Sequence, residues 1–318
     1  MKFESRREHG MQARRLALSC CLALLWLLAS CGGGDRVSTF VPQRLIVFGD
    51  EASVITPAGK KFTVNAVDSS GAIACNSNPN WVQYLAQVFG LVFAQCNAAA
   101  APVTAIDYAA AGAKVADISA QIDQHLATGT FGAKDLVTVL VGANDVVEQY
   151  RLYPAQSEAT LIATLEARGA ALAGQVNRIA QAGGKVLVAT VPDLSLTPFA
   201  LAEKAANPAT DDRAALIRRL LDRFNAKMRI NLINDGSMIG LVFAEDLVQL
   251  MVRFPQSYGL VNVIDAACTT ALPDCTTQTL TTGASGDTWL WADSLQLSAG
   301  GHRQLGANAE GRARNNPF

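Results

Sequence analysis

The chain alternates short apolar runs with longer segments in which apolar residues recur at helical spacing. Unbroken apolar runs of about four to eight residues indicate buried strands, and apolar residues three and four apart indicate helices with one packed face. The runs predict strands over residues 44–48, 105–109, 136–141, 185–191 and 239–244. The spacing predicts helices over residues 79–89, 115–126, 161–179, 211–228 and 298–307.

This alternation of strands and helices predicts an α/β fold. A strand that is followed by a helix and then by another strand favours a parallel sheet with right-handed crossovers. The predicted strands are apolar throughout instead of alternating, which is typical of a parallel sheet covered by helices on both faces. The ligand site of such a sheet lies at the carboxyl ends of its strands.

Three local features lead to further expectations. Asn78 and Pro79 suit the cap and the first residue of a helix, whereas residues 56–80 read as a polar excursion along the surface. Residues 268–283 read as a loop closed by its own cysteines. His125 falls in the last turn of a predicted helix, where a histidine usually serves the helix dipole or contacts solvent.

The composition fits one sizeable domain. The chain has 318 residues, half of them apolar, and a net charge of −1. Domains of the α/β class commonly reach about 250 residues. A near-zero net charge offers no basic face for nucleic acid, so we expect no nucleic-acid partner.

The first residues predict an export signal instead of part of the fold. Arginines precede an apolar run over residues 16–30, which is too short for a spanning helix of about 20 residues. The run ends in Leu-Ala-Ser-Cys31 and is followed by three glycines, which looks like a bacterial lipobox with a lipid-modified Cys31. An ordinary signal peptide with a chance cysteine is the alternative, and Met11 is a second candidate start. We therefore expect a lipoprotein signal peptide over 1–31, a tether over 32–43 and one domain over 44–318.

Four cysteines remain in the body of the chain after three in the leader: Cys75, Cys96, Cys268 and Cys275. An even number in an exported chain suggests disulfides, and four cysteines allow three pairings. Sequence proximity favours Cys75–Cys96 and Cys268–Cys275, with buried free thiols as the alternative. Metal-ligand spacing is missing, so we expect no metal site and no cofactor.

Several motifs resemble the blocks of the GDSL (SGNH) hydrolases, which cleave acyl esters. The first predicted strand ends in Gly49-Asp50-Glu51, where the family has Gly-Asp-Ser. Gly112 matches the second block, Gly142-Ala143-Asn144-Asp145 the third, and Val191-Pro192-Asp193-Leu194 a segment of the lipase-like members. Asp293 and His302 fall in the region of the fifth block. The resemblance implies a three-layer α/β/α sandwich with a parallel, flavodoxin-like sheet.

The same resemblance implies a division of labour that this chain keeps only in part. In the family the serine attacks, and a histidine three residues after an aspartate takes its proton. The oxyanion is held by the backbone N–H at the serine, the glycine N–H and the asparagine side chain. Carried over by position, Gly112 and Asn144 would hold the oxyanion and Asp293 would orient the base. Glu51 stands at the nucleophile position and Gln296 at the base position. A glutamine cannot accept and return a proton, so the triad is broken at two places.

Three alternatives remain open. Ser53 could act as a displaced nucleophile with His302 as its base, although a packed histidine is the plainer reading. Glu51 could itself attack as a carboxylate. The third concerns the orientation of the Glu51 side chain. Its carboxylate either accepts hydrogen bonds from the Gly112 N–H and the Asn144 amide or points into solvent. A distance above about 4 Å from both donors would exclude the hydrogen-bonded orientation.

The sequence thus predicts an exported lipoprotein of the GDSL ester-hydrolase family whose catalysis is impaired. The alternative is an active acyl-ester hydrolase with a displaced nucleophile such as Ser53. The expected partners are an acyl-ester or lipid-like ligand and, through Cys31, a membrane. Gly32 after the cysteine is compatible with an outer-membrane lipoprotein of the bacterial cell envelope, facing the periplasm or the cell surface.

Overall fold

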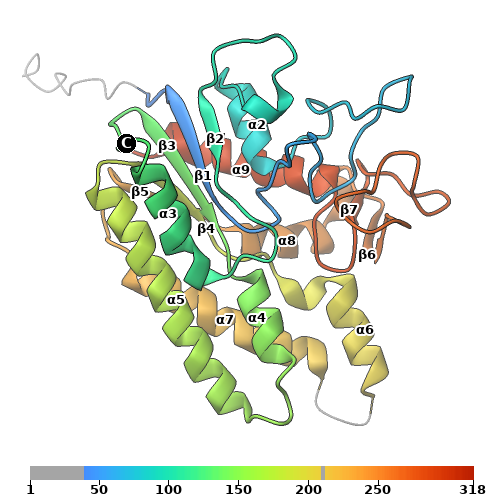
Figure 1. Ribbon diagram of the computed structural model, residues 1–318. Coiled ribbons are helices and arrows are strands. Elements are labelled where there is room, and N and C mark those ends of the chain that lie inside the picture. The colour runs from blue at the N-terminus through green and yellow to red at the C-terminus, as the bar shows by residue number, and fades with distance from the viewer. Residues whose placement is uncertain (1–38, 209–211) are drawn as a thin grey trace, which may run out of the picture. The chain divides into compact units, whose positions relative to one another are not determined.

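A parallel five-stranded sheet forms the centre of the molecule in the computed structural model, which describes residues 39–208 and 212–318 (Figure 1). The strand order is β2-β1-β3-β4-β5. The strands are β1 (Arg44–Gly49), β2 (Ala105–Asp107), β3 (Asp135–Leu140), β4 (Lys185–Ala189) and β5 (Ile239–Val242). This order confirms the predicted flavodoxin-like sheet, whose direction of winding reverses beside β1 and so leaves a crevice at the carboxyl end of that strand.

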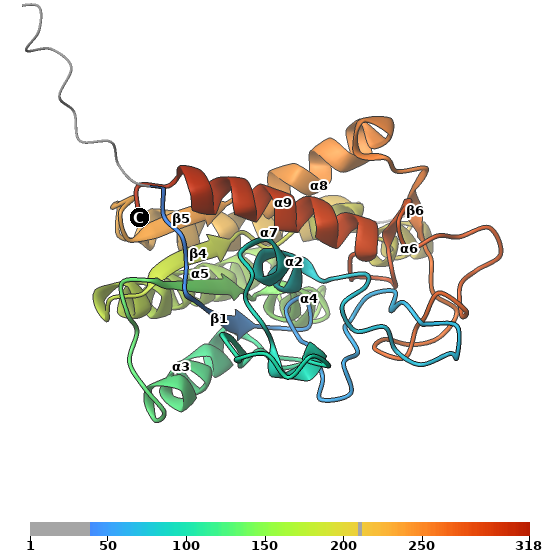
Figure 2. The same cartoon turned by 90° about the horizontal axis from the view of Figure 1, so that it is seen from above.

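Helices cover both faces of the sheet, as the two views show (Figures 1 and 2). Side chains alternate along each strand, so Ile46 and Phe48 of β1 join one apolar cluster while Leu45 and Val47 join the other. The first cluster is completed by α3 (Ile118–Leu126), α4 (Ala143–Tyr150), α5 (Glu158–Gln181), α6 (Pro198–Ala206) and α7 (Arg213–Asn231). The second is completed by α2 (Trp81–Val88), α8 (Ala244–Arg253) and α9 (Ala299–Asn315). The predicted three-layer architecture is confirmed.

A second, two-stranded sheet lies outside the five-stranded one. It contains the parallel pair β6 (Asn262–Ala266) and β7 (Trp289–Trp291). The disulfides Cys75–Cys96 and Cys268–Cys275 are both present, so the pairing favoured by sequence proximity is confirmed. In the described part of the chain, every helix is too short or too polar to cross a membrane. Cys31 and the rest of the expected leader lie outside the described residues.

The prediction that residues 56–80 lie on the surface is wrong around residues 61–65, whereas residues 66–79 are exposed or half-buried. Lys61, Thr63 and Asn65 are fully buried. The Lys61 ammonium donates to the carbonyl oxygens of Cys75 (2.7 Å) and Ser77 (2.9 Å). These polar residues lie inside because backbone carbonyls satisfy them, and carbonyl partners leave no mark in the sequence.

Helix α2 begins two residues later than predicted. Its cap is Asn80, whose side chain accepts from the Gln83 N–H at 2.9 Å, while Asn78 has a positive φ of 49°. Helix α9 extends to Asn315, past the predicted end at 307, because Ala309 and Ala313 remain buried against the second cluster. The spacing of large apolar residues therefore underestimates the length of a helix whose packed face is made of small residues.

The prediction for His125 is also wrong. Its side chain is buried, and its ring lies within contact distance of three aromatic rings, with centroid separations of 6.2 Å to Phe48, 5.5 Å to Tyr108 and 4.6 Å to Phe131. Burial lowers the pKa of His125 from its ordinary value. The histidine therefore packs as an aromatic residue and not as a cation at a helix end.

Candidate active site

The site begins where β1 ends. Gly49 has a φ of +155°, and a Cβ at this position would lie 2.3 Å from the carbonyl oxygen of Leu140 on β3. Only glycine fits this close approach, which lets the chain turn out of the sheet immediately after the strand. The turn places Asp50 and Glu51 at the carboxyl edge, the position expected for a ligand site.

The Glu51 carboxylate binds both donors that the sequence assigns to the oxyanion. The Gly112 N–H donates to Oε1 at 2.9 Å, and the Asn144 side-chain amide donates to Oε2 at 2.8 Å. Both distances lie well inside the limit of about 4 Å set for this arrangement. The prediction that Glu51 folds back onto these two groups is confirmed.

Neighbouring elements fix the two donors. Gly142 has a φ of +127°, and a Cβ there would lie 2.5 Å from the ring of Phe224, so glycine is required just before α4 begins with Asn144 in its first turn. Asp145 accepts from the Val115 N–H at 3.0 Å and from Arg168 at 3.0 Å. This contact ties the segment that carries Gly112 to α4, which explains how the two donors keep their separation.

Asp293 organises the turn that carries Gln296. Its Oδ1 accepts from the backbone N–H of Leu295 at 2.8 Å and of Gln296 at 2.7 Å. Burial, and to a lesser extent the charge of Glu51, raises the pKa of Asp293. Glu51 and Asp293 are therefore close enough to interact, and the Gln296 side chain lines the cavity between their two segments.

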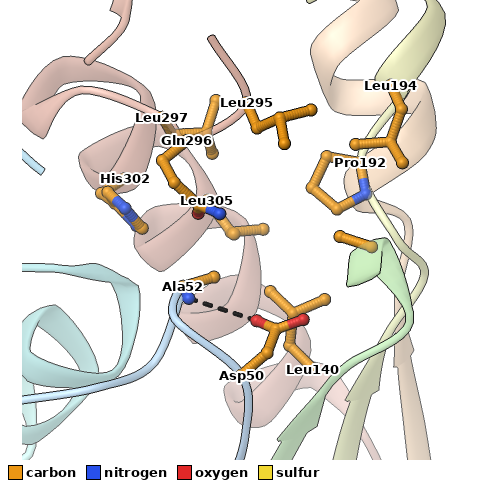
Figure 3. Close-up of a pocket in the computed structure, with 11 residues that line it drawn as sticks. Asp50, Ala52, Leu140, Pro192, Leu194, Leu295, Gln296, Leu297, His302 and Leu305 are labelled. Carbon is orange, nitrogen blue, oxygen red and sulfur yellow. Dashed lines mark hydrogen bonds between the residues drawn. The ribbon is translucent and has the colours of Figure 1, made fainter. Parts of the chain in front are cut away.

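That cavity has a volume of about 20 Å³, which is room for about one water-sized group (Figure 3). It is bounded by Asp50, Ala52, Leu140, Ala143, Pro192, Leu194, Leu295, Gln296, Leu297, His302 and Leu305. Burial, and then the charge of Glu51, raises the pKa of Asp50 well above its usual range. Sequence reasoning missed Asp50, although its place directly before Glu51 in the turn was a usable signal.

Ser53 and the histidines do not form a nucleophile–base pair. Ser53 is fully buried, and its hydroxyl oxygen accepts from the Trp81 indole N–H at 3.1 Å. His302 is buried within α9, and neither of its ring nitrogens has a hydrogen-bond partner in the part of the chain that the structure describes. Burial lowers the pKa of His302 to about 3. His125 Nδ1 lies 3.3 Å from the Tyr108 hydroxyl. The geometry gives no support to a displaced nucleophile at Ser53.

Within residues 39–208 and 212–318, no cluster of His, Cys, Asp and Glu side chains could hold a metal ion. The site contains the Glu51 carboxylate, which is held by two hydrogen-bond donors, and the carboxyl groups of Asp50 and Asp293, whose pKa values are raised. It also contains the half-buried side-chain amide of Gln296. It contains a place where a negative oxygen is stabilised, and the protein's own side chain fills it.

The comparisons place this geometry in a family. The sequence matches the model of the GDSL-like lipase/acylhydrolase family over residues 45–308. A search of curated proteins found no match. The fold is similar to Axe2, an acetylxylan esterase from Geobacillus stearothermophilus, at 14% identity over 88% of this chain and 98% of that chain, with a TM-score of 0.48. It is also similar to a lipolytic G-D-S-L family protein from Veillonella parvula, at 12% identity over 84% and 96% of the two chains, with a TM-score of 0.40. Because the family match spans most of its length, this chain belongs to the GDSL-like lipase/acylhydrolase family.

Proposed function

We propose that this protein is a GDSL-family member whose ester cleavage is strongly impaired and which serves in the bacterial envelope as a lipid-anchored binding protein. The observation that carries the proposal is the pair of hydrogen bonds from Gly112 and Asn144 to the Glu51 carboxylate. Family membership supplies the reaction class, ester hydrolysis, against which the impairment is measured.

The carbonyl oxygen of an ester becomes negative when the carbonyl carbon is attacked. Two preorganised donors stabilise that oxygen in an active enzyme, and losing one typically costs a factor of about 10²–10³ in rate. In this protein a carboxylate already holds both donors through charge-assisted bonds, which are stronger than bonds to a neutral carbonyl. A substrate carbonyl would have to displace Glu51 before it could be polarised.

Proton transfer supports the same conclusion. Gln296 stands at the base position, and the Asp293 carboxylate accepts from backbone N–H groups there instead of orienting an imidazole. A carboxylate attack by Glu51 would leave an acyl intermediate that only an activated water could release. His302 is held neutral by burial, and its ring has no hydrogen bond to any described carboxyl group.

The test is the double variant Glu51→Ser with Gln296→His, assayed on short and medium acyl esters. Because the donors stay in place, we expect turnover at least about 100-fold above that of the parent. The two single variants are matched controls, since one lacks the base and the other lacks the nucleophile. Parent turnover as fast as that of the folded double variant would overturn the proposed impairment. No gain in the folded double variant would show that these two positions do not limit activity.

The envelope role depends on the leader and has its own experiment. Mass spectrometry of the mature protein from a bacterial host should find a lipid-modified N-terminal cysteine derived from Cys31, and Cys31→Ser should abolish the modification and release the protein from the membrane fraction. An unmodified mature N-terminus would contradict the anchor while leaving the proposed impairment intact.

A further inference from the structure

The cavity beside Glu51 is walled by apolar side chains except at three places. Asp50 enters from the turn after β1, Gln296 from the turn before α9, and His302 from α9 itself. The carboxyl, amide and imidazole groups approach one space from different sides (Figure 3). These elements are far apart in sequence, so the fold brings the three groups together.

Two of these polar groups are buried without a side-chain partner. Asp50 is 3% exposed, and its Oδ1 accepts only from the Ala52 N–H at 3.2 Å among the described side-chain contacts. His302 is 1% exposed, and both ring nitrogens lack partners in the described ranges. His302 is therefore a buried polar group without a partner, which is costly, and a ligand in the cavity that donates a hydrogen bond to it would relieve that cost.

The charges around the cavity favour a cation. The negative charges of Glu51 and Asp145 both act on Asp50, and that of Glu51 acts on Asp293. In residues 39–208 and 212–318, no Lys or Arg forms an ion pair with Asp50, Glu51 or Asp293. Two cations oppose these charges: Arg168 pairs with Asp145 at 3.0 Å, and Lys61 acts on His302 while it donates to backbone carbonyls.

The hydrogen-bonding capacity of the three groups is complementary to one kind of ligand. A carboxylate oxygen, a ring nitrogen of neutral histidine and a side-chain amide oxygen are all acceptors. A primary ammonium group has three donors and no acceptor, and it is close to water in size. A carboxylate ligand would find no cation here, and a neutral ester would leave the acidic groups without a counter-charge.

We propose that this cavity binds a primary ammonium group, with its three N–H bonds donated to Asp50, His302 and Gln296 and its alkyl chain lying on the half-buried rim of Pro192 and Leu295. The inference rests on the proposed function, because it describes the ligand of a site that no longer cleaves esters. It assigns to the site a primary alkylamine in place of an acyl ester.

Binding of an ammonium has a consequence for protons. Burial raises the pKa of Asp50 well above its usual range, and a cation bound beside it would lower that pKa again. Where Asp50 is protonated before binding, its ionisation beside the arriving cation releases a proton to the solvent, while the ammonium keeps all three of its own. Titration calorimetry in buffers of different ionisation enthalpy should therefore detect release of up to about one proton per ligand.

The experiment compares four ligands with the same chain: hexylammonium, trimethylhexylammonium, hexanol and hexanoate. Hexylammonium should bind in a saturable way with proton release. The trimethyl compound should bind about tenfold more weakly because it has no N–H donor and does not fit a water-sized cavity. Hexanoate and hexanol should bind more weakly still. Equal binding of all four would overturn the inference, since apolar contact alone would explain it.

Variants test the named groups. Asp50→Asn should weaken hexylammonium binding at least about tenfold and abolish proton release, and Gln296→Met should weaken binding through loss of one acceptor. Asp107→Asn is the control, because Asp107 is a half-buried carboxyl at the end of β2 whose pKa is also raised by burial, but it lies outside the cavity. Unchanged binding in folded Asp50→Asn and Gln296→Met would refute the site.

Ester hydrolysis by the same parent sample separates the two proposals. If the parent shows no ester turnover and no saturable ammonium binding, the cavity holds water only. That result would refute ammonium binding and leave the proposed loss of ester cleavage intact. Fast ester turnover would refute the proposed function whatever the amine does.

Discussion

Replacing Glu51 with alanine should convert a filled anion site into an empty one. In the parent, the carboxylate accepts at 2.9 Å from Gly112 and at 2.8 Å from Asn144. The variant loses both bonds and gains two free donors at the same place. A small carboxylate such as acetate should then bind where the side chain was.

The size of the effect follows from these two bonds. Hydrogen bonds to a charged group contribute about 1.5–3 kcal/mol each, and Glu51 is half-buried, so the lower part of that range applies. Two bonds of about 2 kcal/mol correspond to a dissociation constant for acetate of about 1 mM. The negative charges of nearby carboxyl groups weaken acetate binding and so raise this dissociation constant. Glu51→Ala should also be less stable than the parent, by up to about 4 kcal/mol.

The assay is thermal unfolding of the variant in rising acetate at constant ionic strength. The melting temperature of Glu51→Ala should rise with acetate, and that of the parent should not. Glu51→Gln is the matched control, because its side chain fills the same space and keeps an acceptor without the charge. A folded Glu51→Ala variant that acetate fails to stabilise, or a parent that acetate stabilises equally, would refute the reasoning.

Three further predictions concern stability and are checked by chemical or thermal unfolding. Replacing Cys75 and Cys96 with alanine should cost about 3 kcal/mol, because the bridge closes a loop with a sequence separation of 21 residues; no loss under oxidising conditions would contradict this. Protonation of His302 should cost stability as pH drops below about 6.5, because burial in the folded state lowers the pKa of His302 to about 3 while the unfolded value is ordinary. Burial raises the pKa values of Asp50 and Asp107, whose protonation opposes that loss, so the quantity to measure is the stability of the parent relative to His302→Leu. This difference should fall as pH drops below about 6.5, and an unchanged difference would contradict the assignment. Gly49→Ala should destabilise the protein by at least about 2 kcal/mol, since its Cβ would meet the Leu140 carbonyl oxygen.

The sequence predicts the architecture well because apolar pattern and packing agree along most of this chain. Continuous runs such as residues 136–141 are buried on both sides, as a central parallel strand requires. The predictions were wrong where polar residues are satisfied by distant backbone. Asn65 donates to the carbonyl oxygens of Pro273 and Cys275, about two hundred residues away, and no local pattern encodes such a contact.

Some contacts of the candidate site could likewise be predicted from the sequence, and others could not. The contact of Glu51 with Gly112 and Asn144 could be predicted because motif positions bring three residues to one sheet edge, and a carboxylate suits donors arranged for a negative oxygen. Asp50 and His302 could not be assigned a shared cavity from sequence, because their approach depends on how α9 packs beside the turn after β1. Burial, which sets their protonation, is a property of the fold and not of the motif.

The loss of the nucleophile can be measured by serine-directed phosphonate labelling of the purified parent, with the Glu51→Ser and Gln296→His double variant alongside. Intact-protein and peptide mass spectrometry detect and locate the adduct. We expect no adduct on the parent and one adduct at position 51 of the double variant. An adduct at Ser53 of the parent, accompanied by ester turnover, would contradict the proposed loss of ester cleavage.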